Sequence, residues 1–433
     1  MLYPKANDMR FMLLGLILLS PIVSGQSDSL TYFQLKVPVD YSDPASGFTT
    51  IYYESGAPFS REKLTVFVIA DAQQFYVRKG AMSQLQNSLF DSTFNVIGII
   101  GRNNNSDLKR RVTDAAGTIN WPEASKIFSW LQYVNDIDAV RKKLLGDRGK
   151  ISLYGQSGGG LLVHQYLSKY GEFVDKAFTG ASVDYSLDSE SGINHDRFWM
   201  ETCARDPSFA KRFTLLLEKK TFPRELIAML FQRQNFFVQT DRLFFERNKL
   251  LDHLLMNDTA VINTYLTKYQ IKDILAFIDS PDGIPVKVRL FEFMVPLSGC
   301  FEIESDRFQP DLENLYFSCL PLIQSRNNNK IEPVLIDHRP LHLLETEVFV
   351  LSGRWDHTAD YRSQIALASI YRNHYLFIAD DNHTFTSLKS KGLYNQLLIK
   401  FLKYGKEDPR FRDFMKSCES YRWKEGARSS SVQ

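Results

Sequence analysis

The sequence lacks the features that mark several large classes of protein. Its 433 residues carry a formal net charge of only +2, so the basic excess typical of nucleic-acid-binding proteins is missing. It has no internal repeat, phosphate-binding loop, dinucleotide fingerprint or metal-ligand cluster, so we expect no cofactor and no metal. No segment approaches the ~20 apolar residues that a membrane-spanning helix needs, so we expect no integral membrane segment in the mature chain.

The single notable apolar run, residues 11–19, lies close to the N-terminus. It follows the basic residues Lys5 and Arg10 and precedes the small residues at 23–25. This order is typical of an export signal, and the run is too short to span a bilayer comfortably. We therefore predict that residues 1–25 are a signal peptide and that the protein is exported, either secreted or periplasmic. A retained interfacial anchor is the alternative.

Cysteine is scarce, with Cys203, Cys300, Cys319 and Cys418 the only examples. In an exported protein they are candidates for disulfide bonds, and four cysteines allow three pairings. Cys300 and Cys319 are nearest in sequence and form the expected pair. Without export, four buried free thiols are the better expectation.

A short segment around Ser157 organises the chain. Strand-like residues 151–154 lead directly into Gly155-Gln-Ser-Gly-Gly159, and an apolar helical segment, 161–167, follows. This is the strand–turn–helix context in which G-x-S-x-G acts as a nucleophile elbow. The turn is so tight that side chains at its two outer glycines would meet neighbouring backbone. Ser157 is therefore the predicted nucleophile, rather than one residue of a chance Gly/Ser-rich turn.

Strand and helix signals alternate along most of the chain. Continuous apolar runs at residues 64–69 and 94–100 are typical of strands buried on both faces of a parallel sheet. Apolar residues three or four positions apart predict a helix around 125–145. This alternation predicts an α/β fold with a mostly parallel sheet.

The alternation stops in the middle of the chain. Apolar residues there recur at helical spacing, and strand signals are nearly absent until about 286–290. We interpret residues 185–340 as a mainly helical cap inserted into a sheet domain of residues 26–184 and 341–423. Residues 424–433 are expected to be a disordered tail.

Two further residues complete a candidate catalytic triad. A serine hydroxyl is a poor nucleophile until a base takes its proton, and the base needs an acid partner that fixes its tautomer. Asp356 and His383 each follow a predicted strand, so both are expected on the same rim of the sheet as Ser157. The chain order Ser, Asp, His is that of hydrolases with this elbow.

Other residues compete for these two roles. Asp360 is the alternative acid, and Asp356 could instead cap the helix that follows it. His383 could be a simple surface histidine. The other candidate bases are His357, His374, which precedes the last strand, and His164, which falls inside the elbow helix where a packing role is expected.

Acyl transfer also needs two backbone N–H groups to hold the oxyanion. One is expected from Gly158, directly after the nucleophile. The other is expected from the loop at residues 70–75, where Ala72 is the chosen donor.

Four segments occur in the order found in a known family: residues 36–44 (KVPVDYSDP), 94–102 (FNVIGIIGR), 135–141 (NDIDAVR) and the GQSGG elbow. Together they resemble the prolyl- and tripeptidyl-aminopeptidase group of α/β-hydrolase serine peptidases. The resemblance covers the sheet domain and matches Asp356 and His383 to the family's acid and base. The family usually has His-Gly-Gly-Pro-Gly where this chain has Ala70-Asp-Ala-Gln-Gln74, a departure that bears on loop geometry and substrate preference.

The resemblance implies an α/β-hydrolase fold and cleavage of small peptides from their N-terminus. We therefore predict an exported serine hydrolase, an aminopeptidase that works through an acyl-enzyme. An esterase or lipase with the same triad is one alternative, and it would turn over short acyl esters but not peptide anilides. A catalytically inactive binding protein of the same fold is another, supported only by the altered oxyanion loop.

An exopeptidase of this kind must also hold the free ammonium of its substrate, which a carboxylate can do. Glu302 and Glu304 lie in the predicted cap, and their spacing would put both on one side of an extended strand. A solvated acidic edge is the alternative, because charged residues are usually exposed.

Overall fold

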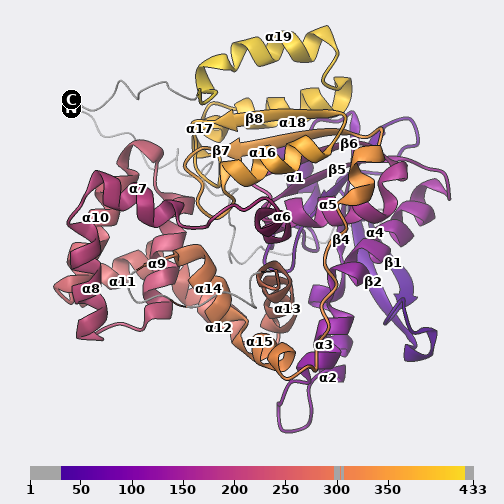
Figure 1. The fold of residues 1–433 in the computed structure, drawn as a ribbon. Coiled ribbons are helices and arrows are strands. Elements are labelled where there is room, and N and C mark those ends of the chain that lie inside the picture. The colour runs from indigo at the N-terminus through magenta and orange to yellow at the C-terminus, as the bar shows by residue number, and fades with distance from the viewer. Residues whose placement is uncertain (1–30, 297–302, 304–306, 425–433) are drawn as a thin grey trace.

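A computed structural model of the chain describes residues 31–296, 303 and 307–424 (Figure 1). The predicted signal peptide therefore lies outside the described residues, as do Cys300, Glu302, Glu304 and all but the first residue of the predicted tail. No helix in the described ranges is both long and apolar enough to cross a membrane.

An eight-stranded sheet forms the centre of the molecule (Figure 1). Its strands are β1 (Tyr32–Pro38), β2 (Phe48–Ser55), β3 (Leu64–Ile69), β4 (Phe94–Ile100), β5 (Ile151–Gln156), β6 (Val174–Gly180), β7 (Glu347–Gly353) and β8 (His374–Ala379). They lie in the order β1-β2-β4-β3-β5-β6-β7-β8. The pairs β1–β2 and β2–β4 are antiparallel and every other pair is parallel. This is the α/β-hydrolase fold, so the predicted fold class is confirmed.

Helices cover both faces of the sheet (Figure 1). Those outside the inserted region are α1 (Met82–Leu89), α2 (Ser106–Arg111), α3 (Trp121–Ile127), α4 (Trp130–Leu145), α5 (Gly158–Tyr170), α16 (Tyr361–Ile370), α17 (Thr386–Ser390), α18 (Leu393–Tyr404) and α19 (Pro409–Ser417). Neighbouring residues of β3 supply two separate cores: Phe67 packs with α4, α5 and α16, while Val66 packs with α1, α18 and α19. Burial on both faces explains why the strand is a continuous apolar run.

The chain between β6 and β7 is helical. Its helices are α6 (Tyr185–Glu190), α7 (Arg197–Arg205), α8 (Phe209–Lys219), α9 (Arg224–Phe237), α10 (Leu243–Leu255), α11 (Thr259–Lys268), α12 (Ile271–Ile278), α13 (Gly283–Met294), α14 (Pro310–Ser318) and α15 (Leu320–Asn327). Helices α7 to α12 enclose an apolar core of their own, whereas α13, α14 and α15 contribute to one of the cores of the sheet. We call α7 to α15 the cap. Its last helices attach it to the sheet domain.

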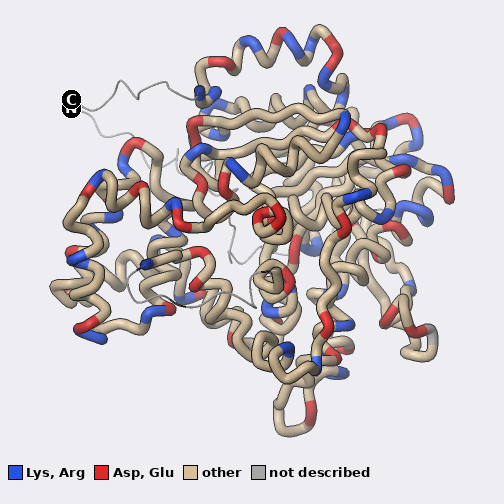
Figure 2. Tube along the Cα trace, viewed as in Figure 1, with Lys and Arg blue, Asp and Glu red and all other residues tan. Residues whose placement is uncertain are grey.

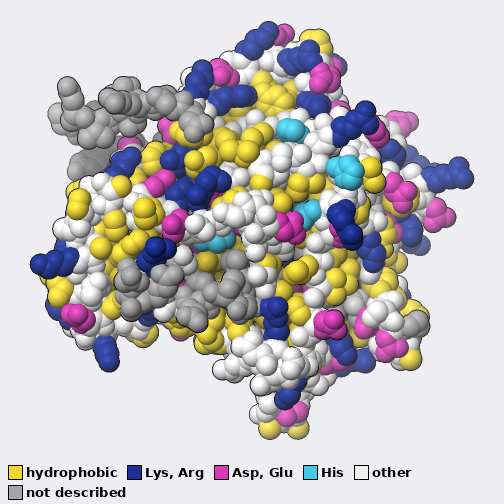
Figure 3. Space-filling view, viewed as in Figure 1, with side chains coloured by type: hydrophobic (Ala, Val, Ile, Leu, Met, Phe, Trp, Pro, Cys, Tyr) yellow, Lys and Arg dark blue, Asp and Glu magenta, His cyan; other side chains and the backbone are white. Residues whose placement is uncertain are grey.

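Charged residues are distributed without an excess of one sign. Figure 2 shows acidic and basic positions interspersed over the trace, in the cap as well as around the sheet. On the face drawn in Figure 3, side chains of both charges are mixed with apolar ones. This distribution agrees with the small net charge of the sequence.

A buried ion pair joins the cap to the sheet domain. Arg289 of α13 donates hydrogen bonds to both carboxylate oxygens of Asp71, in the loop after β3, at 3.0 to 3.2 Å. It also donates to Gln165 of α5 at 3.0 Å and pairs with Glu292. The side chains of Arg289 and Asp71 are both 0% exposed. Full burial of a charge is tolerated when it is paired and hydrogen-bonded in this way.

We expect the change Arg289→Met to lower the free energy of unfolding by about 3 kcal/mol or more, because it leaves the Asp71 carboxylate buried without its counter-charge. Urea denaturation followed by circular dichroism measures the loss. The control is Lys150→Met, which breaks an exposed pair with Asp175 and should leave the transition unchanged. Equal stability of the two variants would contradict the role given to Arg289.

Three local expectations differ from the structure. Residues 286–290, expected as a strand, belong to helix α13. Residues on almost every side of this helix are buried, so the alternation of apolar and charged residues did not reflect burial of one face of a strand. The helix expected at 125–145 is two helices, α3 and α4, separated by residues 128 and 129. Helix α19 lies near the end of the sheet domain, where no helix was expected.

The described cysteines, Cys203, Cys319 and Cys418, are free thiols. The thiol of Cys319 donates a hydrogen bond to the backbone oxygen of Leu315 at 3.0 Å, and burial raises its pKa. The disulfide expected between Cys300 and Cys319 is therefore not supported, although Cys300 itself lies outside the described residues.

Candidate active site

Ser157 occupies a strained turn between β5 and α5. Its backbone has φ 56° and ψ −125°, a conformation that costs free energy for a residue with a side chain. A Cβ on Gly155 would lie 2.3 Å from the backbone oxygen of Gly159, and one on Gly159 would lie 2.4 Å from that of Ile69. Both glycines are thus required by close backbone contacts, as the elbow predicts. The Ser157 N–H donates to the oxygen of Gly180 at 2.8 Å and holds the turn against β6.

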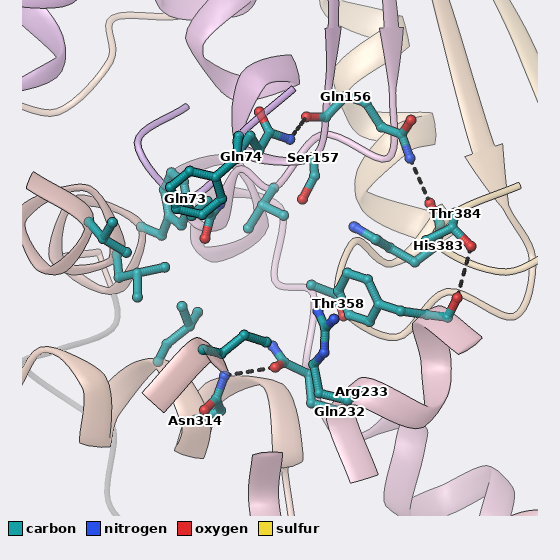
Figure 4. Close-up of a pocket in the computed structure, with 18 of the residues that line it drawn as sticks. Gln73, Gln74, Gln156, Ser157, Gln232, Arg233, Asn314, Thr358, His383 and Thr384 are labelled. Carbon is teal, nitrogen blue, oxygen red and sulfur yellow. Dashed lines mark hydrogen bonds between the residues drawn. The ribbon is translucent and has the colours of Figure 1, made fainter. Parts of the chain in front are cut away.

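His383 and Asp356 form a buried pair beside this turn. Nδ1 of His383 lies 2.8 Å from Oδ2 of Asp356, and the two residues are 1% and 0% exposed. Because an ionised carboxylate can only accept, Nδ1 carries the proton and Nε2 is left for the serine. Ser157 and His383 line one pocket and point into the same space (Figure 4). No hydrogen bond joins these two described side chains, and such bonds commonly form only when substrate is bound.

The cap supplies two residues that hold this pair in place. Asn235 of α9 donates from its side chain to Oδ1 of Asp356 at 3.1 Å, next to the backbone N–H groups of Thr358 and Ala359 at 2.9 and 3.1 Å. Oδ1 is thereby occupied, and Oδ2 faces the imidazole. The ring of Phe236, also in α9, lies 4.3 Å from the His383 ring, centroid to centroid. Nothing local in the sequence signals these contacts, because the partners are more than 100 residues apart.

Asp360, the alternative acid, has a different role in the structure. Its carboxylate accepts from Arg197 at 3.0 Å and from the backbone N–H of Arg362 at 2.9 Å. Asp360 is therefore the N-cap residue of helix α16 and forms an ion pair with Arg197 of the cap. Asp356 is not the N-cap residue of that helix. The geometry favours Asp356 as the acid.

The other histidines lie away from the pocket that contains Ser157. His164 is fully buried, 2.6 Å from the hydroxyl of Tyr371, and burial lowers its pKa to about 3. His357 lies 3.1 Å from a carboxylate oxygen of Glu201, and burial lowers its pKa to about 4. His374 begins β8, at the end of the strand opposite to His383. The expected packing role of His164 agrees with this placement.

A third carboxyl group is buried near the pair. Asp311 of α14 accepts a hydrogen bond from the hydroxyl of Thr358. Burial raises its pKa to about 6, and the charge of Asp356 adds to the increase. Asp311 is thus a titratable group that the sequence pattern did not single out.

The two acids can be separated by turnover measurements. Asp356→Asn should lower kcat by about 10⁴-fold, because an amide stabilises the wrong imidazole tautomer. Asp360→Asn alters a helix cap and an ion pair, so it should reduce stability while kcat stays near that of the wild type. If kcat falls strongly in Asp360→Asn and hardly changes in Asp356→Asn, the acid of the triad is Asp360.

The predicted oxyanion donors lie in different environments. Gly158 begins α5, where free backbone N–H groups favour negative charge. The Ala72 N–H donates to the Asp71 carboxylate at 2.5 Å, so it is already engaged. The side-chain amide of Gln73 lies beside Gly158, 2.5 Å from where a Cβ on that glycine would be, and Gln73 lines the pocket. Gln73 is therefore a second candidate donor, one missed because donors were sought only in the backbone.

The pocket over Ser157 is mostly apolar, and the cap forms part of its walls. Helices α9, α12, α13 and α14 contribute lining residues, among them Met229, Phe236, Ile274, Phe277, Val286, Leu290, Phe293 and Leu315. Apart from His383, Arg233 is the one side chain of a charged type among the described lining residues, which include no Asp or Glu. Nor does the described part of the chain contain a group of three or more His, Cys, Asp or Glu residues that could hold a metal ion.

A scan against known protein families and a search of curated proteins both find no match. Among solved structures, the chain is similar to a bromoperoxidase from Bacillus anthracis, with 15% identity and a TM-score of 0.43 over 86% of this chain and 100% of that one. It is also similar to an acetylester hydrolase from Corynebacterium glutamicum, with 12% identity and a TM-score of 0.40 over 86% of this chain and 95% of that one. A further similar structure is the enol-lactonase from Burkholderia xenovorans LB400, with 10% identity and a TM-score of 0.39 over 82% of this chain and 96% of that one. Likeness at this level carries no argument about activity. The α/β-hydrolase assignment rests on the strand order and on the elbow at Ser157.

Proposed function

We propose that this protein is a serine hydrolase that cleaves a carbonyl substrate through an acyl-enzyme. The observation that carries the proposal is the strained turn at Ser157 beside the buried pair of His383 and Asp356. In this mechanism Ser157 Oγ attacks the substrate carbonyl while His383 Nε2 accepts its proton. Asp356 keeps the proton on Nδ1 and stabilises the imidazolium. The Gly158 N–H and the side-chain amide of Gln73 hold the oxyanion, because the predicted donor Ala72 N–H is engaged by Asp71.

Release of the product reverses these proton transfers. The imidazolium of His383 gives its proton to the leaving group as the tetrahedral intermediate collapses to the acyl-enzyme. A water molecule, deprotonated by the same Nε2, then attacks the acyl carbon and frees Ser157. The apolar cap residues around the pocket support this chemistry, because a site with little water strengthens its electrostatic interactions.

Labelling with a fluorophosphonate probe tests the nucleophile. Ser157→Ala should abolish labelling and lower turnover by about 10⁶-fold, as loss of the nucleophile does in other triads. The matched control is Ser168→Ala, a change in the same helix at its far end, which should label like the wild type. Labelling that persists without Ser157 would refute the proposal.

The finer proposal is an aminopeptidase, and it rests on the sequence motifs that resemble that family. The carboxylates expected to hold a substrate ammonium, Glu302 and Glu304, lie outside the described residues. An esterase is the second candidate, favoured by the apolar pocket without an acidic residue among its described lining. Export through residues 1–25 likewise stays a prediction.

A substrate comparison separates these two functions. If the protein is an aminopeptidase, acetylating the N-terminus of a peptide anilide should lower kcat/KM by about 10-fold or more, because the acetyl group removes the charge-assisted hydrogen bonds of the ammonium. Glu302→Gln or Glu304→Gln should reduce that difference. Equal rates on free and acetylated anilides would end the aminopeptidase proposal. Turnover of short acyl esters without turnover of either anilide would support the esterase.

A further inference from the structure

Arg233, in the cap helix α9, lines the pocket above Ser157. We propose that it anchors a carboxylate on the substrate, so that the enzyme acts on an ester or amide that carries an acidic group near the scissile carbonyl. The inference rests on the proposed serine hydrolase function and specifies the class of its substrate.

The first argument is that the guanidinium of Arg233 has unused hydrogen-bonding capacity. Arg233 is 5% exposed, and its Nε donates to the backbone oxygen of Tyr269 at 3.1 Å. Its Nη2 is buried with no hydrogen-bond partner, and no described carboxylate forms an ion pair with it. Burial lowers its pKa to about 9. A carboxylate bound in the pocket would supply the missing charge.

Other buried arginines of the chain show what Arg233 lacks. Arg102, Arg141 and Arg289 are each 0% exposed, and each lies within 3.0 Å of an Asp carboxylate. Their carboxylate partners satisfy the usual condition for burying a charge. Among the described residues Arg247, 1% exposed, also forms no ion pair with a carboxylate, but it does not line the pocket. Arg233 lines the pocket, so a ligand bound there is placed to supply its counter-charge.

The second argument is the position of Arg233 relative to the reacting groups. The guanidinium carbon lies 4.9 Å from the centroid of the Phe236 ring, and that ring lies 4.3 Å from the His383 ring. One aromatic ring thus separates the cation from the catalytic imidazole, and Ser157 lies across the same cavity (Figure 4). A carboxylate on Arg233 would therefore be a short chain of atoms from a carbonyl at Ser157.

The chemistry of the pocket around Arg233 also favours a carboxylate over other polar groups as the ligand. A guanidinium has donors only, and its planar fork matches a carboxylate. A substrate ammonium would be repelled at this wall. The surrounding lining residues, such as Met229 and Phe236, are apolar, so they would contact the carbon chain that joins the carboxylate to the carbonyl.

The test compares an acidic ester with its neutral counterpart. The substrates are the p-nitrophenyl monoester of glutaric acid and the same compound with its free carboxyl methylated. We expect the wild-type enzyme to favour the acid by about 10-fold or more in kcat/KM, the range expected of a hydrogen-bonded ion pair. Arg233→Met should remove this preference by slowing the acid and not the methyl ester. Arg233→Lys, which keeps the charge, should retain part of it.

The control variant is Arg242→Met, which changes an exposed arginine of the same cap and should keep the wild-type preference. A second pair of substrates is the α-glutamyl and the glutaminyl p-nitroanilide. A preference for the acid that is confined to the glutarate esters indicates an acidic ester as the substrate. A preference confined to the anilides indicates an acidic peptide. If Arg233→Met does not fold, two other measurements replace it. The first is the substrate preference of Arg233→Lys. The second is protection of the wild type from fluorophosphonate labelling, which monomethyl glutarate should give and dimethyl glutarate should not.

The outcomes distinguish this inference from the proposed function. A wild-type protein that the fluorophosphonate does not label at Ser157 fails as a serine hydrolase. A labelled enzyme that handles the acidic substrates no better than the neutral ones, including one that hydrolyses none of them, overturns the inference alone. An Arg233→Met enzyme that slows both members of a pair equally also overturns it, because that pattern indicates a structural role.

Discussion

The site depends on the close backbone packing of the turn around Ser157 against its neighbours. Gly155 approaches Gly159, and Gly159 approaches Ile69 at the end of β3, so closely that neither position has room for a side chain. This packing and the hydrogen bond to Gly180 hold Ser157 in a conformation that it would not adopt alone. Because β5, β7 and β8 are parallel, the loops that follow them meet at this same rim.

The cap contributes residues to the candidate active site as well as to the walls of its pocket. Helix α9 contributes Asn235 to the carboxylate of Asp356 and Phe236 to the face of His383, and it places Arg233 in the pocket wall. Helix α13 is held to the sheet domain by Arg289. A movement of the cap would therefore change the support of the acid–base pair together with the substrate pocket, since one helix supplies both.

Much of the fold and the proposed triad could be predicted from sequence because their signals are local. A strand buried on both faces has to be apolar throughout, and residues 64–69 and 94–100 are. The elbow needs glycine at fixed positions around Ser157, and parallel strands place the residues after them on one rim, which was enough to select Asp356 and His383. Alternation of strands and helices predicted an α/β fold with a mostly parallel sheet for the same reason.

Other features depended on contacts between residues far apart in the chain, which no local pattern records. The segment 286–290 alternates like a strand but lies in a helix, because the surrounding cap and sheet bury it on nearly all sides. Sequence proximity suggested a partner for Cys319, whose thiol is free. Packing likewise explains why the Asp71 carboxylate accepts from the Ala72 amide and why no described carboxylate lies beside Arg233. The sequence alone thus determined the fold class and the candidate reacting groups, while the tertiary structure decided which buried charges are paired and which one lines the pocket without a described carboxylate.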